Sequence, residues 1–384
     1  MKWEIAKLGD ISKNIQTGPF GSQLHQSDYS ECGIPVVMPK DLVGGKISEE
    51  SIARVDKTHV ERLCRHKIEV GDILYSRRGD VGRCAHVTKK EEGWLCGIGC
   101  LRVTIDSEKA DSRFVFFQLQ HPDTVGWVEK HAVGATMLNL NTTILSSVPI
   151  RLPALEIQKR IADILSAYDD LIENNQKQIK LLEEAAQRLY KEWFVDLHFP
   201  GHENTKVVDG VPEGWRKFPL EEIAPVVTGK KDANYGDKGG NYPFFTCSQE
   251  TITAPGYSFD TSAVILAGNG DFNVKLYRGK FEAYQRTYVL APFDHSNLFN
   301  LYFTVQDNME ALAKGASGST IKFLTKGMLQ KILVLTADKK VLDKFNDYEE
   351  NIQQKVEALK KQVEDLTEIR NRLLPKLMSG EVEV

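Results

Sequence analysis

The stretch LIENNQKQIKLLEEAAQRLYKEWF, residues 171–194, decides how the chain is organised. It belongs to a segment in which apolar residues recur mostly every three, four or seven positions. This spacing is typical of one face of a long helix that packs against another helix. The apolar positions of this seam are Ile157, Ile161, Ile164, Tyr168, Ile172, Ile179, Leu182 and Leu189.

The C-terminal segment supplies a matching helix, which the first one needs because an unpartnered apolar stripe would face water. Its apolar positions each follow a member of the first seam by 184 residues: Val341, Phe345, Tyr348, Ile352, Val356, Leu359, Val363, Leu366 and Leu373. We expect an antiparallel coiled coil with pseudo-twofold symmetry. Asn175 is the polar exception in the first seam, and it is either a buried residue that fixes register or a solvated one.

The segments between the helices repeat as well, with their landmarks in the same order. The matching segments are 3–11 with 215–223, 17–18 with 228–229, 71–82 with 262–273, 133–141 with 317–325, and 148–153 with 332–336. The chain therefore divides into a first domain (1–153), a central helix (154–196), a second domain (197–338) and a distal helix (339–384).

Both domains are predicted to be of the α+β class. Short β-branched or aromatic runs bounded by Gly, Asn and Asp predict strands at 35–38, 73–76, 242–246 and 264–267. Helical patterns cover 113–120 and 297–306.

Composition narrows the class of protein. The 384 residues carry a formal net charge of −4 and are 41% hydrophobic, enough for two or three domains. The absence of a leading apolar region and of a long apolar stretch predicts a cytoplasmic protein with no membrane contact. Cys96 and Cys100, with Cys84 and His86, could form a zinc site, but the absence of a second tight pair favours buried thiols.

Catalytic motifs are missing from the sequence. It has no phosphate-binding loop of the G-x4-G-K-[ST] type and no Pro-Pro dipeptide of the kind that amino-group methyltransferases use. We therefore expect a binding protein with no catalytic residues, no metal and no cofactor of its own. A coiled-coil adaptor that binds other proteins is the alternative to a DNA-binding protein.

Basic and amide side chains on Gly-rich loops are the candidate DNA contacts, because such loops can approach phosphates and base edges. In the first domain they are Gln23, Arg77, Arg78 and Arg83, and the hydroxyl residues Thr17 and Ser22 of the same loops are candidates with them. In the second domain they are Lys230, Lys231, Asn234, Asn269, Lys275, Arg278 and Lys322. Tyr190, Trp193 and Phe194 end the central helix. Core packing against the domains explains them, a docking site for a methyltransferase subunit is the functional interpretation, and the two are compatible.

Several segments resemble the specificity subunits of type I restriction–modification systems. They are residues 171–194, the preceding VPIRLPALEIQKRIADIL (148–165), RNRLLPKLMSGEV (370–382), TGPFGSQLHQSDY (17–29) and the Gly-Ala-Thr stretch at 134–136. The resemblance covers essentially the whole chain. The helices depart from some family members in lacking short tandem repeats, which leaves the spacer length undefined.

This resemblance implies a role and a set of partners. Each domain would read one half of a split target in double-stranded DNA, and the helices would set the unspecified spacer. Two methyltransferase subunits would dock on the helices, and restriction subunits would join the assembly. S-adenosylmethionine would be bound by the methyltransferase subunits, which would methylate adenine.

Overall fold

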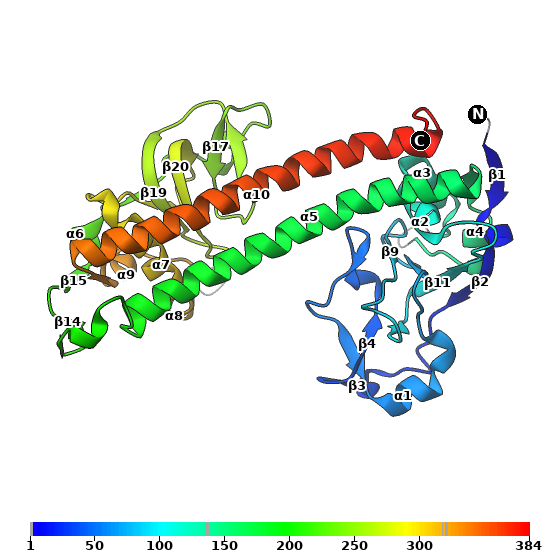
Figure 1. Cartoon of the computed structure of the whole chain (residues 1–384), viewed down its shortest axis with the longest axis horizontal. Coiled ribbons are helices and arrows are strands. Elements are labelled where there is room, and N and C mark those ends of the chain that lie inside the picture. Colours follow the sequence, from blue (N-terminus) through cyan, green and yellow to red (C-terminus); the bar gives the residue numbers. More distant parts are fainter. Residues whose placement is uncertain (1–2, 135–137, 317, 319–321) are drawn as a thin grey trace. The chain divides into compact units, whose positions relative to one another are not determined.

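The computed structural model describes residues 3–134, 138–316, 318 and 322–384. The chain divides into two compact units, Met1–Asn175 with Lys361–Val384, and Gln176–Lys360. Each unit contains one of the predicted α+β domains together with one end of each long helix (Figure 1).

The first domain is built on an antiparallel sheet with strand order β2-β11-β8-β9. Its strands are β2 (Ser12–Thr17), β11 (Cys100–Ile105), β8 (Ile73–Ser76) and β9 (Cys84–His86). A second sheet has the order β10-β4-β7-β3, formed by Leu95–Cys96, Ile34–Val37, Ala53–Val55 and Tyr29–Ser30. The remaining elements are β5 (Leu42–Val43), β6 (Lys46–Ile47), α1 (Lys57–Arg62), α2 (Ser112–Gln120), α3 (Pro122–His131) and α4 (Thr142–Ser146). Tyr75 and Phe114 are fully buried in the main core.

The second domain is built on a six-stranded sheet with the order β16-β21-β19-β20-β17-β18. These strands are Val226–Thr228, Thr287–Leu290, Phe259–Ala267, Val274–Ala283, Tyr242–Phe245 and Ile252–Ala254. The other elements are β13 (Val207–Val208), β14 (Val211–Pro212), α6 (Leu220–Ile223), α7 (Leu298–Asp307), α8 (Met309–Gly315) and α9 (Lys326–Gln330). The strands and helices predicted at 73–76, 242–246, 264–267, 113–120 and 297–306 are confirmed to within a few residues, except that β19 begins five residues earlier.

The predicted repeat is confirmed by strand pairing in each domain. β1 (Glu4–Lys7) pairs antiparallel with β12 (Pro149–Leu152), and β15 (Arg216–Pro219) pairs in the same way with β22 (Leu333–Thr336). The register is the same in both pairs, since Glu4 faces Leu152 and Arg216 faces Thr336. In each domain the first strand therefore pairs with the strand that comes just before the long helix.

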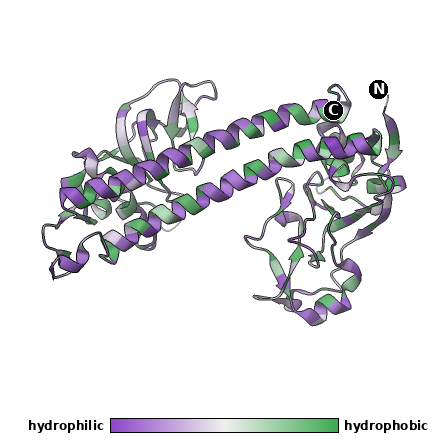
Figure 2. Ribbon diagram, viewed as in Figure 1, coloured by the Kyte–Doolittle hydropathy of each residue, from purple (hydrophilic) through white to green (hydrophobic). Residues whose placement is uncertain are grey.

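The two long helices are α5 (Leu155–Tyr190), extended by a π turn over Lys191–Val195, and α10 (Lys339–Ser379). In the first unit, Asp169 pairs with Arg370 and Asn175 with Gln362. In the second unit, Glu183 pairs with Lys360, while Tyr190 packs on Phe345. Within each unit the partner number falls as the α5 number rises, which confirms antiparallel packing. Figure 2 shows the mixture of polar and apolar residues along both helices.

Most seam residues are buried or half-buried, but Tyr348 is not. Its side chain is 49% exposed, whereas the neighbouring Glu349 is fully buried. The physical reason is that this end of α10 also packs against the second domain, which shifts the buried face to Leu342, Phe345 and Glu349. The seam prediction is therefore wrong at Tyr348.

Asn175 resolves the two alternatives for the polar seam position. It is only 7% exposed, and its Nδ2 donates a hydrogen bond to Oε1 of Gln362 at 3.2 Å. Asn175 is therefore a buried, paired seam residue and not a solvated one. Such a residue favours one register of two helices over others.

The aromatic residues at the end of α5 belong to the core of the second domain. Tyr190, Trp193 and Phe194 are 4–7% exposed and form a cluster that includes Phe345 and Trp215. The hydroxyl of Tyr190 lies 3.0 Å from Oγ1 of Thr304. Because these rings are covered from within the unit, the prediction of a docking patch at them is wrong.

The cysteines of the first domain are mostly core residues. Cys84, Cys96 and Cys100 are buried, and burial raises the pKa of the Cys84 and Cys96 thiols to about 12. Across the part of the chain that the structure describes, no three His, Cys, Asp or Glu side chains are grouped to hold a metal ion. None of the described helices is both long and apolar enough to cross a bilayer.

Candidate nucleic-acid interface

One edge of the first domain's sheet brings the predicted loops together. β2 and β8 are both antiparallel to their shared neighbour β11, so both strands end where β11 begins. The N–H of Gly18 donates to the carbonyl of Cys100 at 2.9 Å, and that of Arg77 donates to the carbonyl of Gly99 at 2.7 Å. The loops that follow β2 and β8 therefore emerge from one edge, about 10 Å apart at two strand spacings.

The second domain has the same arrangement. β16 and β19 are both antiparallel to β21, and both end where β21 begins. The N–H of Gly229 donates to the carbonyl of Thr287 at 3.0 Å, and that of Gly268 donates to the carbonyl of Arg286 at 2.9 Å. We call these regions the first loop edge (17–23, 77–83 and 138–140) and the second loop edge (228–234, 268–273, 285–286 and 322–324).

The paired Thr-Gly dipeptides have a steric explanation. A Cβ on Gly18 would lie 2.0 Å from the carbonyl oxygen of Gly97, and one on Gly229 would lie 2.0 Å from that of Ala283. No side chain fits at such a distance from a backbone oxygen. The two glycines therefore let a neighbouring backbone segment pass closely at the base of each loop.

In each domain a third segment is hydrogen-bonded to one of these loops, the loop after β8 in the first domain and the loop after β19 in the second. The N–H of Leu140 donates to the carbonyl of Arg77, and that of Leu324 donates to the carbonyl of Gly268, both at 2.8 Å. The repeated segments 133–141 and 317–325 thus support equivalent loops. Residues 135–137, which include Ala135 and Thr136 of the Gly-Ala-Thr stretch, and residues 317 and 319–321 lie outside the described residues.

The arginines of the first loop edge differ in how far they are already paired. Arg78 is exposed, and no hydrogen bond or ion pair of its guanidinium occurs among the described residues. Arg83 donates through Nε to Oδ2 of Asp80 at 2.7 Å. Arg77 is half-buried, and its Nε is buried without a partner in the described part of the chain. Arg78 is therefore the guanidinium best placed to meet an external ligand.

The polar residues of the loop after β2 lie at the same edge. Thr17 is half-buried at the end of β2, and Ser22 is exposed. Oε1 of Gln23 accepts a hydrogen bond from the N–H of Phe20 at 3.0 Å, and the Phe20 ring is 54% exposed. This loop thus presents one hydroxyl and one aromatic ring to solvent, while Gln23 partly supports the loop itself.

Most of the predicted residues of the second domain also lie at its loop edge. Lys230 and Lys322 are exposed, and Asn234 is exposed in a 3-10 turn over Ala233–Tyr235. The Lys231 ammonium lies 4.3 Å from the centre of the Tyr235 ring, a cation–π contact. Asn269 is half-buried in the loop after β19.

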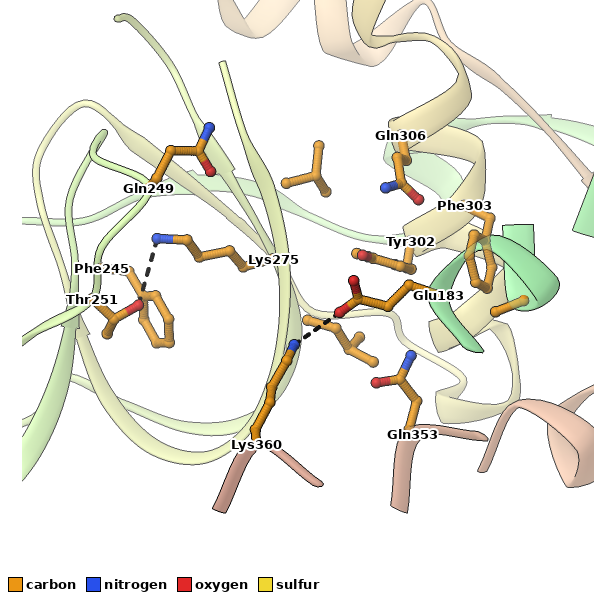
Figure 3. A pocket seen from close by; sticks show the side chains of 13 residues that line it. Glu183, Phe245, Gln249, Thr251, Lys275, Tyr302, Phe303, Gln306, Gln353 and Lys360 are labelled. Atoms are coloured by element: carbon orange, nitrogen blue, oxygen red, sulfur yellow. Dashed lines mark hydrogen bonds and ion pairs between the residues drawn. The ribbon is translucent and has the colours of Figure 1, made fainter. Parts of the chain in front are cut away.

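Lys275 and Arg278 are engaged within the second unit instead. Lys275 points into a cavity of about 520 Å³ (Figure 3), where Nζ donates to the carbonyl of Ser248 at 2.8 Å and contacts Thr251 Oγ1 at 3.5 Å. Burial lowers its pKa. Nη1 of Arg278 donates to both carboxylate oxygens of Glu350 on α10, at 2.9 Å to Oε1 and 2.7 Å to Oε2. The structure does not bring either side chain to the second loop edge, so their prediction as DNA contacts is not supported.

The structure adds residues that the sequence reading missed. A cavity of about 340 Å³ at the second loop edge is lined by Thr228, Gly268, Gln285, Arg286 and Phe323, among others. Arg286 is exposed just before β21, outside any Gly-rich loop. Its counterpart in the first domain is Gly99, since each accepts the same backbone hydrogen bond. Following the sequence repeat from the loops after β8 and β19 on to β11 and β21, the strands that pair with these two, would have placed Arg286 at the second loop edge.

Comparison with known proteins agrees with this architecture. The family described as "Type I restriction modification DNA specificity domain" matches residues 1–184 and 212–365. The type I restriction enzyme EcoDI specificity subunit of Escherichia coli is 37% identical over 176 residues, which span 45% of this chain and 39% of that relative. The MjaIX specificity subunit of Methanocaldococcus jannaschii is 26% identical over 417 residues, covering 100% of this chain and 94% of the relative.

A solved structure supports the fold over nearly the whole chain. The type I restriction–modification S subunit from M. genitalium aligns with a TM-score of 0.68 at 17% identity, covering 98% of this chain and 96% of that one. The family match covers most of the sequence and contains both repeated domains. The chain therefore belongs to the family of type I restriction–modification DNA specificity domains.

Proposed function

We propose that this chain is the DNA-recognition subunit of a type I restriction–modification complex, with each domain reading one half of a bipartite target. The observation that carries the proposal is the loop edge that is built twice. In both domains, two loops leave the same sheet edge, a third segment supports them, and basic or amide side chains lie on them. Two similar binding edges in one chain fit a target with two specified blocks.

The side chains of the loop edges suit both parts of DNA recognition. Exposed lysines such as Lys230 and Lys322 can neutralise phosphates, which supplies salt-dependent affinity without sequence preference. Arg78 and Asn269 carry the groups that pair with the major-groove edges of bases. We therefore assign affinity mainly to the lysines and sequence preference to the arginine and amide side chains.

The proposed partners follow from membership of the family. The relatives are specificity subunits of type I restriction enzymes, and we assign this chain the same place beside methyltransferase and restriction subunits. Two methyltransferase subunits would bind the α5–α10 pair and carry S-adenosylmethionine, while this chain supplies recognition and no catalytic step. The cytoplasm is the compartment in which such a complex meets the genome.

Genome-wide methylation mapping tests the proposal. The chain is co-expressed with its methyltransferase partner in a host without adenine methylation, and methylated adenines are mapped. The expected result is a split motif, with two short specified blocks around a fixed gap. A soluble, fully assembled complex that methylates no motif would refute DNA recognition and favour the protein-binding adaptor.

A further inference from the structure

The loops after β8 and β19 occupy equivalent places in the two domains, and the second residue of each loop is a polar residue. Arg78 is the second residue after β8, and Asn269 is the second residue after β19. We propose that Arg78 and Asn269 are equivalent base-reading residues, with Arg78 reading a guanine in one block and Asn269 an adenine in the other. This inference rests on the function proposed above, and it assigns the residue that sets specificity in each loop edge.

The backbone holds both residues in the same way. Arg78 forms an isolated β-bridge with Asn139, and Asn269 forms one with Phe323. The residue before each accepts a 2.8 Å hydrogen bond from Leu140 or Leu324. The residue after each is a glycine with positive φ, +75° at Gly79 and +70° at Gly270. The same turn is therefore pinned at the same place in both domains.

The side chains of these two residues are free to meet a ligand. No hydrogen bond or ion pair involves the Arg78 guanidinium or the Asn269 amide among the residues that the structure describes. The next cation along the first loop, Arg83, is already paired with Asp80. A free polar group on a backbone that is fixed on both sides is the arrangement that specific recognition needs, because little further ordering is required on binding.

The chemistry of the two side chains differs in a way that predicts their bases. A guanidinium donates two parallel hydrogen bonds to N7 and O6 of guanine, whereas a carboxamide accepts from N6 and donates to N7 of adenine. Each such pair discriminates against the wrong base by about tenfold or more. One domain would thus specify a guanine and the other an adenine at equivalent positions.

Reciprocal substitutions test the assignment in the assembled methyltransferase complex. Arg78→Asn and Asn269→Arg are compared with wild type by methylation mapping and by initial methylation rates on duplexes that vary one base at a time. Lys89→Asn, at an exposed ion pair with Glu92, and Asn204→Arg, in an exposed 3-10 turn, are matched controls. Arg78→Asn should reduce guanine preference by about tenfold or more at one position of one block. Asn269→Arg should do the same for adenine in the other block, and the controls should keep both blocks.

The outcomes separate this inference from the function on which it rests. If a variant keeps its base preference at the block that its substitution does not affect, it is folded and bound to its methyltransferase partner. A wild-type complex with a split motif and variants that keep every base preference would overturn the assignment alone. Equal loss in both blocks would overturn it as well. A wild-type complex without any split motif would refute the proposed function itself.

Discussion

Glu349 is fully buried on α10, and neither carboxylate oxygen has a hydrogen-bond partner among the described residues. Burial of the unpaired carboxyl raises its pKa to about 8 from an ordinary value of 4.5. The sequence places Glu349 among charged residues of a helix, which predicts a solvent-exposed side chain. The sequence alone therefore could not predict this burial.

The raised pKa of Glu349 predicts a pH-dependent stability. Between about pH 4.5 and pH 8 the folded protein keeps a proton that the unfolded chain releases, so the free energy of unfolding falls as pH rises through this window. Glu349→Gln removes the titration and should stabilise the protein at pH 8 by about 1 kcal/mol or more. Urea unfolding midpoints, followed by circular dichroism at pH 5.5 and pH 8.0, measure the effect.

The exposed Glu357 on the same helix gives the control for this prediction. Glu357→Gln should leave the difference between the two midpoints as in wild type. If Glu349→Gln also leaves that difference unchanged, the carboxyl does not titrate in this window and the argument from burial is wrong.

At the scale of elements, the sequence predicted what local patterns determine. The heptad-like spacing located α5 and α10. Turn residues bounded the strand at 73–76 correctly and the strand at 242–246 to within one residue. The identical register of β1–β12 and β15–β22 was implicit in the repeated landmarks. These features depend on periodicity and turn chemistry, which act over a few residues.

Contacts between distant elements are what the sequence could not predict. The partner of Arg278 is Glu350, 72 residues away, so a cation on a basic loop pattern proved to join β20 to α10. The rings of Tyr190, Trp193 and Phe194 are covered by residues up to about 150 positions distant, such as Phe345. A sequence shows that a face is apolar, but the fold decides whether a partner protein or the chain itself covers it.

The β20–α10 contact carries its own prediction. Arg278 and Glu350 are each about 40% exposed, so their ion pair contributes at most about 1 kcal/mol. Stacking of the guanidinium on Phe299, at 5.0 Å, adds a similar amount. Arg278→Ala should therefore lower the free energy of unfolding by about 1 to 2 kcal/mol while both blocks of the DNA target stay as in wild type.

A double-mutant cycle with Glu350→Ala separates the ion pair from the stacking contact. The measurements are urea unfolding of each variant and methylation mapping of each assembled complex. Unchanged stability together with a changed base preference would return Arg278 to the DNA contacts that the sequence pattern predicted.

At the scale of the whole molecule, duplication predicts that the two domains act as separate readers. Each loop edge lies wholly inside one compact unit, and no residue of one edge belongs to the other unit. Contributions from sites without shared partners usually add. The duplicated fold therefore predicts that damage to one loop edge affects one block of the target only.

Paired substitutions test this independence. Arg77→Ala with Arg78→Ala impairs the first loop edge, and Lys230→Ala with Asn269→Ala impairs the second. Binding of the assembled complex is measured on duplexes with the intact target, with either block scrambled, and with both scrambled. The duplexes are compared at one salt concentration, and binding to the intact target is repeated over a series of salt concentrations. The first pair should abolish the affinity difference that one block makes and keep the difference made by the other, and the second pair should do the reverse.

A quadruple variant that combines both pairs tests whether the two domains act independently. If they do, its loss of binding free energy should equal the sum of the two paired losses to within about 0.5 kcal/mol. Lysine losses should also reduce the salt dependence of binding, since each phosphate contact releases counterions, whereas loss of Arg78 should act mainly on base preference. Equal weakening of both blocks by either pair would mean that the domains do not read separately. In that case the duplicated loop edges would reflect a duplication in the chain's origin and would not be two separate DNA-reading sites.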